Sequence, residues 1–188
     1  MRFRHRLYQI DEETEGVRLL LRHRLPWLIV GLIGGALITI FISRYETVLS
    51  EQISLAFFLP FIVYLSDAIG AQTEIIFVRN LSKHQPKLTI YLLKELSLGL
   101  TLGVIFGALL ALFAQFWFND SLLAITVGLA MLINAIVATV IGLLVPLLLY
   151  REHADPAVGA GPITTLVQDF ISIVVYFAVA SAVLFGLG

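Results

Sequence analysis

Long runs without charged residues constrain this chain more than any other feature. Three runs, at residues 25–43, 96–119 and 121–150, contain no Asp, Glu, Lys or Arg. A membrane-spanning helix needs about 20 mostly apolar residues, and barrel strands would instead alternate in ~10-residue segments. Two further stretches, at about residues 53–78 and 161–187, have a suitable length and are interrupted only by acids. The sequence therefore predicts an all-α polytopic membrane protein with five transmembrane helices.

The composition excludes several other classes of protein. Apolar residues make up 59% of the 188 residues and charged residues 13%, against about 45–50% and about 25% in an ordinary globular domain. The net charge of −1 argues against nucleic-acid binding. The chain has no cysteine, which excludes disulfides and thiolate chemistry, and its 4 histidines lie in charged flanks. We therefore expect that the chain is not an enzyme.

Basic residues determine the expected orientation. All 12 Lys and Arg residues except Arg44 fall on one side if the N-terminus is cytoplasmic, and the positive-inside rule favours that topology. The C-terminus then lies outside, and the plasma membrane is the expected location. Residues 1–25 lack the apolar region of a signal peptide and are predicted to form a cytoplasmic amphipathic arm. Residues 26–188 form the predicted membrane domain, with Pro26 at the start of its first span.

Small residues recur in the third span at a spacing that suits helix packing. Gly99, Gly103, Gly107 and Ala111 follow one another at intervals of four and share one helix face. Such a row allows another backbone to approach closely, either within the subunit or across a dimer. Asn134, at the middle of the fourth span, is expected to bond to a neighbouring helix, with a pore-facing position as the alternative.

The fifth span carries an acid, Asp169, within a stripe of polar and small residues. An ionisable group inside a bilayer costs at least ~2.5–3.5 kcal/mol, so it is expected to face protein or water. The stripe offers the oxygen ligands that Mg²⁺ and Ca²⁺ prefer. We favour ion contact over the alternative of a hydrogen-bonded or uncharged buried carboxyl. The stripe comprises Gly161, Thr165, Gln168, Asp169, Ser172 and Tyr176, and the opposite, apolar face comprises Leu166, Phe170, Val174 and Phe177.

The second span places two acids on one helix face. Asp67 and Glu74 are separated by about two helical turns, with small residues between them that leave room for a hydrated ion. For Glu74, an ion pair with Arg79 or Lys83 is an equally good interpretation. Asp67 lies deeper in the span without a nearby cation, which favours an ion-binding role. The neighbouring residues expected to line the ion path are Gly70, Ala71 and Gln72.

The segment before the fifth span contains a helix-start signal. Asp155 directly precedes Pro156, and a carboxylate at that position caps free N–H groups. A cap is the first interpretation of Asp155, and a place at the cytoplasmic mouth of an ion path is the second. Glu95, at the start of the third span, is assigned to the same mouth. Gly161 and Pro162 are expected to break or kink the helix that follows.

Several short motifs occur in a fixed order along the chain. They are RLPWL at 24–28, AFFLP at 56–60, GAQ at 70–72, VR at 78–79, KEL at 94–96, DPA at 155–157 and GPITT at 161–165, followed by Asp169. In order and spacing they resemble the membrane domain of MgtE-type magnesium transporters, from about residue 24 to the C-terminus. One motif departs from the family, which commonly has asparagine where Ala68 stands, and Asp67 adds an acid one residue earlier.

The resemblance implies a homodimer of five-helix subunits with a pore on the two-fold axis. It implies that Asp169 of each subunit forms a selectivity site for hydrated Mg²⁺, and that Gly161 lines the pore. Family members usually carry an N-terminal domain and paired CBS domains that sense cytosolic Mg²⁺. These domains are missing from the 188 residues, so we expect any such regulation to come from a separate cytosolic subunit.

The expected function is therefore passage of a hydrated divalent cation, with Mg²⁺ as the leading candidate, through a homodimeric pore in the bilayer. One alternative is a proton- or sodium-coupled divalent cation transporter that uses Asp67, Glu74 or Asp169 as a proton acceptor. Another is a membrane subunit that does not transport and instead partners a regulatory protein. An intramembrane aspartic protease is disfavoured, because the glycine-rich signature of such a site is missing around Asp67 and Asp169.

Overall fold

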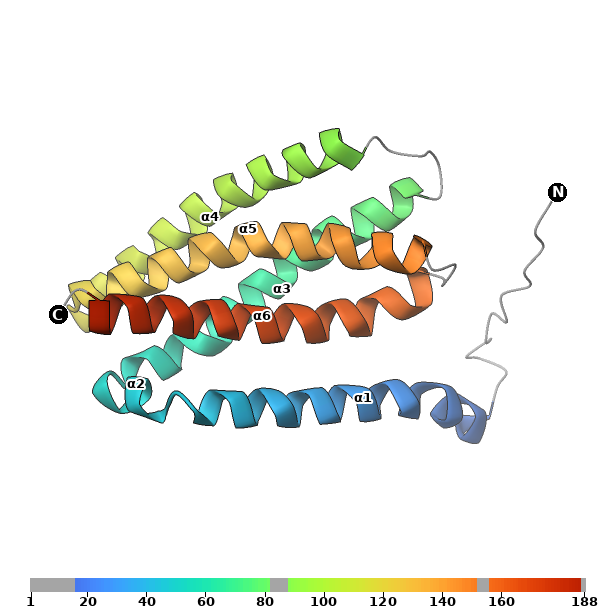
Figure 1. Ribbon diagram of the computed structural model, residues 1–188, viewed down its shortest axis with the longest axis horizontal. Helices are drawn as coiled ribbons and strands as arrows, with labels where there is room; N and C mark the ends of the chain where they lie inside the picture. Colours follow the sequence, from blue (N-terminus) through green and yellow to red (C-terminus); the bar gives the residue numbers. More distant parts are fainter. Residues whose placement is uncertain (1–15, 82–87, 152–155, 187–188) are drawn as a thin grey trace.

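The computed structural model describes residues 16–81, 88–151 and 156–186, and all of its regular elements are helices (Figure 1). The described part of the chain contains no strand, which confirms the all-α prediction. In chain order the helices are α1 (Val17–Ser43), α2 (Glu46–Glu51), α3 (Ser54–Leu81), α4 (Leu88–Phe118), α5 (Ser121–Arg151) and α6 (Pro156–Gly186).

Helix α5 is the central element of the bundle. It packs against α4, α3 and α6, and α3 also packs directly against α6. Many of its inward-facing residues are small, including the buried Ala130, Ala135 and Ala138, and small side chains allow neighbouring helices to approach closely. Helix α1 lies along one side of the bundle, next to α6 (Figure 1). The contact between α3 and α6 positions the site described below.

Four helices are long and apolar enough to cross a membrane: Ser54–Asn80, Leu88–Phe118, Ser121–Leu149 and Thr164–Gly186. They correspond to the predicted second to fifth spans, so the chain is a multi-pass membrane protein. Among the described residues of α1, the apolar stretch Leu28–Ser43 is shorter. A fifth transmembrane helix at this position therefore stays a prediction.

The glycine row of the third predicted span packs within the subunit, against α5. Gly99, Gly103 and Gly107 are all buried on α4. A Cβ added at Gly103 would lie 2.7 Å from the carbonyl oxygen of Leu132, and one added at Gly107 would lie 2.7 Å from that of Gly128. The two backbones are therefore in direct contact, as the spacing predicted. Of the two alternatives, packing within the subunit and packing across a dimer, the structure shows the first.

The apolar face of α6 meets α1 and the turn that follows it. Phe170 lies edge-on to Phe41, with ring centroids 5.3 Å apart, and Phe177 stacks on Tyr45 at 4.5 Å. Leu166 contacts Gly34 of α1, where a larger residue would compete for the same space. These contacts confirm that this face of the fifth predicted span packs against apolar neighbours.

One expectation about a helix boundary was wrong, and a second was wrong in part. Helix α1 begins at Val17, so Pro26 lies inside a continuous helix rather than at its first turn. Helix α6 runs from Pro156 through Gly161 and Pro162 without a break, which excludes the break expected there, whereas a kink stays a prediction. Proline removes one backbone donor and clashes with the carbonyl one turn back, so each of these positions interrupts the hydrogen bonding of its helix only locally. The remainder of α6 therefore keeps its hydrogen bonds.

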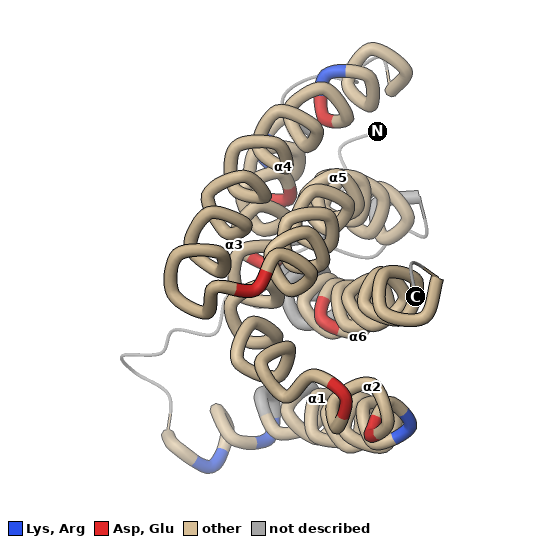
Figure 2. Tube along the Cα trace, turned by 90° about the vertical axis from the view of Figure 1, so that its left-hand side faces the viewer, with Lys and Arg blue, Asp and Glu red and all other residues tan. Residues whose placement is uncertain are grey.

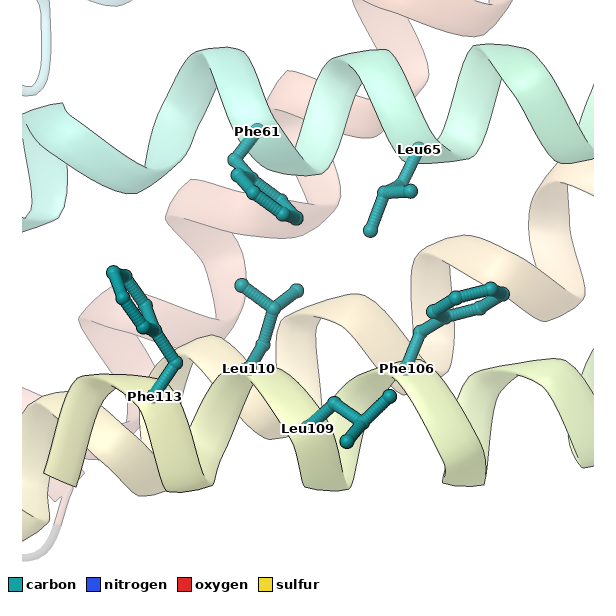
Figure 3. Close-up of a pocket in the computed structure, with 6 residues that line it drawn as sticks. All are labelled: Phe61, Leu65, Phe106, Leu109, Leu110 and Phe113. Atoms are coloured by element: carbon teal, nitrogen blue, oxygen red, sulfur yellow. The ribbon is translucent and has the colours of Figure 1, made fainter. Parts of the chain in front are cut away.

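An apolar pocket of about 350 Å³ lies between α3 and α4 (Figure 3). Aromatic and leucine side chains from both helices point into it, and none of them carries a group that binds an ion. The pocket is lined by Phe61, Leu65, Phe106, Leu109, Leu110 and Phe113. This pocket therefore offers no polar ligand.

Candidate ion-binding site

Three acids on two membrane spans are linked by electrostatic interactions. Asp67 and Glu74 lie on α3 and Asp169 lies on α6. Figure 2 marks the acidic positions of the chain in red. Asp67 interacts electrostatically with Asp169 and with Glu74. Each of the three side chains is partly buried. The sequence alone left open whether Asp67 and Asp169 share one site. The packing of α3 on α6 brings the two acids within electrostatic reach of one another, and a shared site stays a prediction.

Thr164, near the start of α6, adds a buried hydroxyl to this group. Its side chain is 3% exposed and lies beside Glu74. The hydroxyl oxygen nevertheless has no partner at hydrogen-bond geometry among the described residues, so it contacts the carboxyl without bonding to it. Hydroxyl and carboxylate oxygens are both ligands for hard cations. Sequence analysis missed this contact because it depends on the register between α3 and α6.

The polar stripe of α6 divides into two parts. Thr165 is exposed and Asp169 is partly buried, whereas Gln168, Ser172 and Tyr176 are fully buried inside the subunit. The Gln168 side-chain amide donates a hydrogen bond to the Ser172 hydroxyl at 3.3 Å, and the Tyr176 hydroxyl donates to the carbonyl of Leu55 at 2.7 Å. The pore-lining roles expected for Gln168 and Ser172 stay predictions.

Asn134 links α5 to the buried part of the same stripe. Its side-chain amide donates a hydrogen bond to the backbone carbonyl of Ser172 at 3.3 Å. This confirms the expectation that Asn134 bonds to a neighbouring helix. The bond crosses from α5 to α6 within the apolar interior, where an unpaired polar group is costly.

The small residues of α3 have different environments. Ala71 and Gln72 are exposed, whereas Gly70 is buried. A Cβ added at Gly70 would lie 3.1 Å from the side-chain oxygen of Gln168 and 3.3 Å from the carbonyl oxygen of Ala138. The missing side chain of Gly70 therefore allows α3, α5 and α6 to meet.

Glu95 is buried on α4 and bonded to α3. The Thr73 hydroxyl donates a hydrogen bond to a carboxylate oxygen of Glu95 at 2.9 Å. Thr73 directly precedes Glu74, so the bond fixes α4 next to the acidic group. The mouth position assigned to Glu95 stays a prediction, and its observed role is to join two helices.

Replacing Thr73 with valine is expected to destabilise the protein by about 1–3 kcal/mol, because the buried Glu95 carboxylate loses its donor while the shape of the side chain is kept. Thermal unfolding in detergent measures the effect. Thr101→Val is the matched control, since Thr101 is exposed on α4 and its hydroxyl donates to the carbonyl of Ser97 in its own helix. Equal melting temperatures for the two variants would contradict the prediction.

Some predicted site residues lie beyond what the structure describes. Asp155 and Lys83 fall outside the described residues, and Gly161 belongs to the first turns of α6, where side-chain surroundings are not described. Within the described residues, no group of three or more acidic or histidine side chains is arranged to hold a metal ion directly.

Comparison with known proteins identifies the family. The family profile described as "MgtE: Divalent cation transporter" matches residues 59–179, which include Asp67, Glu74 and Asp169. The chain belongs to the MgtE family of divalent cation transporters. MgtE proteins are transporters, and this membership confirms the expectation that the chain is not an enzyme.

Curated relatives agree with this assignment. The chain is 32% identical to the "Magnesium transporter MgtE" of Bacillus subtilis (strain 168), over 85% of this chain and 36% of the relative. It is 33% identical to that of Enterococcus faecalis, over 92% of this chain and 39% of the relative. The Thermus thermophilus protein of the same name is 27% identical, over 86% and 36%. The chain thus spans less than two fifths of the length of these MgtE relatives.

Proposed function

We propose that this chain forms the ion path of a divalent cation transporter. The observation that carries the proposal is the pairing of Asp67 with Asp169 inside two apolar spans of an MgtE domain. Like charges placed together within hydrocarbon are costly, and a divalent cation between them offsets the repulsion. The relatives named as magnesium transporters support Mg²⁺ as the transported ion.

The ion passes with much of its water. Mg²⁺ dehydrates reluctantly and usually keeps several water ligands. Four side chains are accessible enough to contact the water ligands of the ion. They are the exposed Thr165, Ala71 and Gln72 and the partly buried Asp169. Gly70, Gln168 and Ser172 are buried within the subunit. In this proposal they pack behind the residues that line the ion path and do not contact the ion.

Two copies of the chain complete the pore about a two-fold axis. A second Asp169 brought close to the first would double the negative charge that attracts the ion, and a single carboxylate would hold hydrated Mg²⁺ poorly. In this arrangement α1 supplies a fifth span, the N-terminus is cytoplasmic and the C-terminus is outside, in the plasma membrane. Regulation by a separate cytosolic subunit is part of the same proposal.

Ion flux into proteoliposomes tests this function. The purified chain is expected to carry Mg²⁺ inward under an inside-negative potential, which drives a divalent ion with about twice the ~2.3 kcal/mol per 100 mV that acts on a single charge. The flux is expected to be independent of pH and Na⁺ gradients. Flux that requires either gradient would indicate a coupled transporter, and no flux of any divalent cation would indicate a non-transporting subunit.

A further inference from the structure

Five buried side-chain polar atoms have no hydrogen-bond partner among the described residues. Two belong to Gln52 and Thr164, and the other three lie on three different membrane helices. These three are the hydroxyl oxygen of Ser66 on α3 and the side-chain carbonyl oxygens of Asn134 on α5 and Gln168 on α6. All three side chains are 0% exposed. Buried polar groups are nearly always hydrogen-bonded, and the exceptions require an explanation.

Helix register brings these three atoms to one layer of the bundle. Gly70 touches both Gln168 on α6 and Ala138 on α5. Ser66 lies one helical turn before Gly70, and Asn134 lies one turn before Ala138. Because residues four apart lie above one another on a helix face, Ser66 and Asn134 face the same side as that contact.

The relative directions of α3, α5 and α6 also indicate that the three atoms lie at one level of the bundle. Gly142, one turn after Ala138, contacts both Gly70 and Thr73, so α3 and α5 advance in the same direction. On α6 the order is reversed, because Gln168 lies level with Gly70 while Ser172, one turn later, accepts the hydrogen bond from Asn134. Ser66, Asn134 and the Gln168–Ser172 turn therefore converge.

The chemistry of the three atoms matches one small ligand. Two of them are carbonyl oxygens that only accept hydrogen bonds, and the third is a hydroxyl that can donate one. A water molecule has two hydrogens for the two carbonyls and a lone pair for the hydroxyl. Buried waters typically make about three hydrogen bonds to otherwise unsatisfied polar groups.

We propose that Ser66, Asn134 and Gln168 together bind one internal water molecule at the junction of α3, α5 and α6. This water fixes the rotation of α3 and α6 against one another. Ser66 and Gln168 each directly precede an acid, Asp67 and Asp169, and neighbouring helical residues are about 100° apart around the axis. When Ser66 and Gln168 face the water, Asp67 and Asp169 are therefore turned by about 100° away from it, each around the axis of its own helix.

The consequence for transport rests on the proposed function, whereas the water site does not. Ser66, Asn134 and Gln168 are positioning residues for the acid pair, and none of them needs to touch the transported ion. Loss of the water is expected to raise the Mg²⁺ concentration at half-maximal flux by several-fold, because the two acids are no longer held together.

A structure of the full chain in lipid, at a resolution that shows ordered water, tests the site directly. The expected result is one density peak within hydrogen-bonding distance of the Ser66 hydroxyl and of the Asn134 and Gln168 carbonyl oxygens. The proposal is overturned if the three atoms are bonded to protein groups instead. It is also overturned if the peak has five or more oxygen ligands at about 2.4 Å, which would identify a metal cation.

A double-mutant cycle provides a second test that does not depend on transport. Ser66→Ala and Asn134→Leu are each expected to lower the melting temperature by about 2–4 °C. The double variant is expected to melt close to the less stable single variant, because either change already releases the shared water. Additive shifts would overturn the proposal. Ser97→Ala, an exposed serine on α4 that bonds to its own helix, is the control for loss of a hydroxyl.

The outcomes separate this inference from the proposed function. A water at the predicted position in a chain that carries no divalent cation would support the site and contradict the transport proposal. Normal Mg²⁺ flux in a chain without that water would contradict the site alone.

Discussion

Replacing Asp169 with asparagine is expected to abolish divalent cation transport while leaving the protein folded. Asparagine keeps the size of the side chain and removes its charge. At an effective dielectric constant of about 20, two unit charges 4 Å apart interact by about 4 kcal/mol, and a divalent cation doubles this. Losing even part of that attraction corresponds to a decrease in flux of roughly a hundredfold or more.

The same substitution is expected to leave the melting temperature unchanged or to raise it. Asp169 and Asp67 repel one another in the absence of an ion, so removing one charge relieves an unfavourable interaction. Proteoliposome flux and thermal unfolding of the same preparation measure the two effects. Opposite directions for transport and stability would distinguish an ion-binding acid from one that holds the bundle together.

Glu51→Gln is the control for loss of one negative charge. Glu51 is exposed at the end of α2, away from the acidic group, so this variant is expected to transport normally. An Asp169→Asn protein that carries Mg²⁺ at the unaltered rate would show that the ion path lies elsewhere.

Much of the fold follows from the pattern of the sequence. Uncharged runs located the third and fourth spans, and long apolar stretches interrupted only by acids located the second and fifth, because hydrocarbon requires about 20 apolar residues from a helix that crosses it. The four-residue spacing from Gly99 to Gly107 predicted a close helix contact, and the structure places it on α5. Asn134 bonds across helices as expected, since an isolated amide in the membrane needs a partner.

The sequence could not show which part of the polar stripe of α6 is buried and which part is accessible. Periodicity assigns Gln168, Asp169 and Ser172 to one broad face, but it does not say which neighbour covers each part of that face. The register between α3 and α6 decides that Gln168 and Ser172 are buried while Asp169 stays partly accessible. The bonds Thr73–Glu95 and Tyr176–Leu55 depend on the same kind of information, because they join residues far apart in the chain.

Replacing Gly107 with valine is expected to disrupt the bundle. A Cβ at this position would lie 2.7 Å from the backbone oxygen of Gly128, which has no flexible side chain to move aside. Overpacking of this kind costs about 1–3 kcal/mol, and the two methyl groups of valine add to the clash. Because the α4–α5 contact is the most extensive in the bundle, we expect a large fall in melting temperature and loss of monodisperse protein in detergent.

Gly35→Val is the matched control for this prediction. A Cβ at Gly35 of α1 has no heavy atom within 4 Å, so the variant carries the same change in helix propensity without a clash. It is expected to behave like the unmodified chain in thermal unfolding and size-exclusion chromatography. If the Gly107 and Gly35 variants lose stability to the same extent, helix propensity rather than backbone contact explains the glycine row. If only the Gly107 variant is destabilised, the close approach of the α4 backbone to the α5 backbone contributes directly to the stability of the bundle.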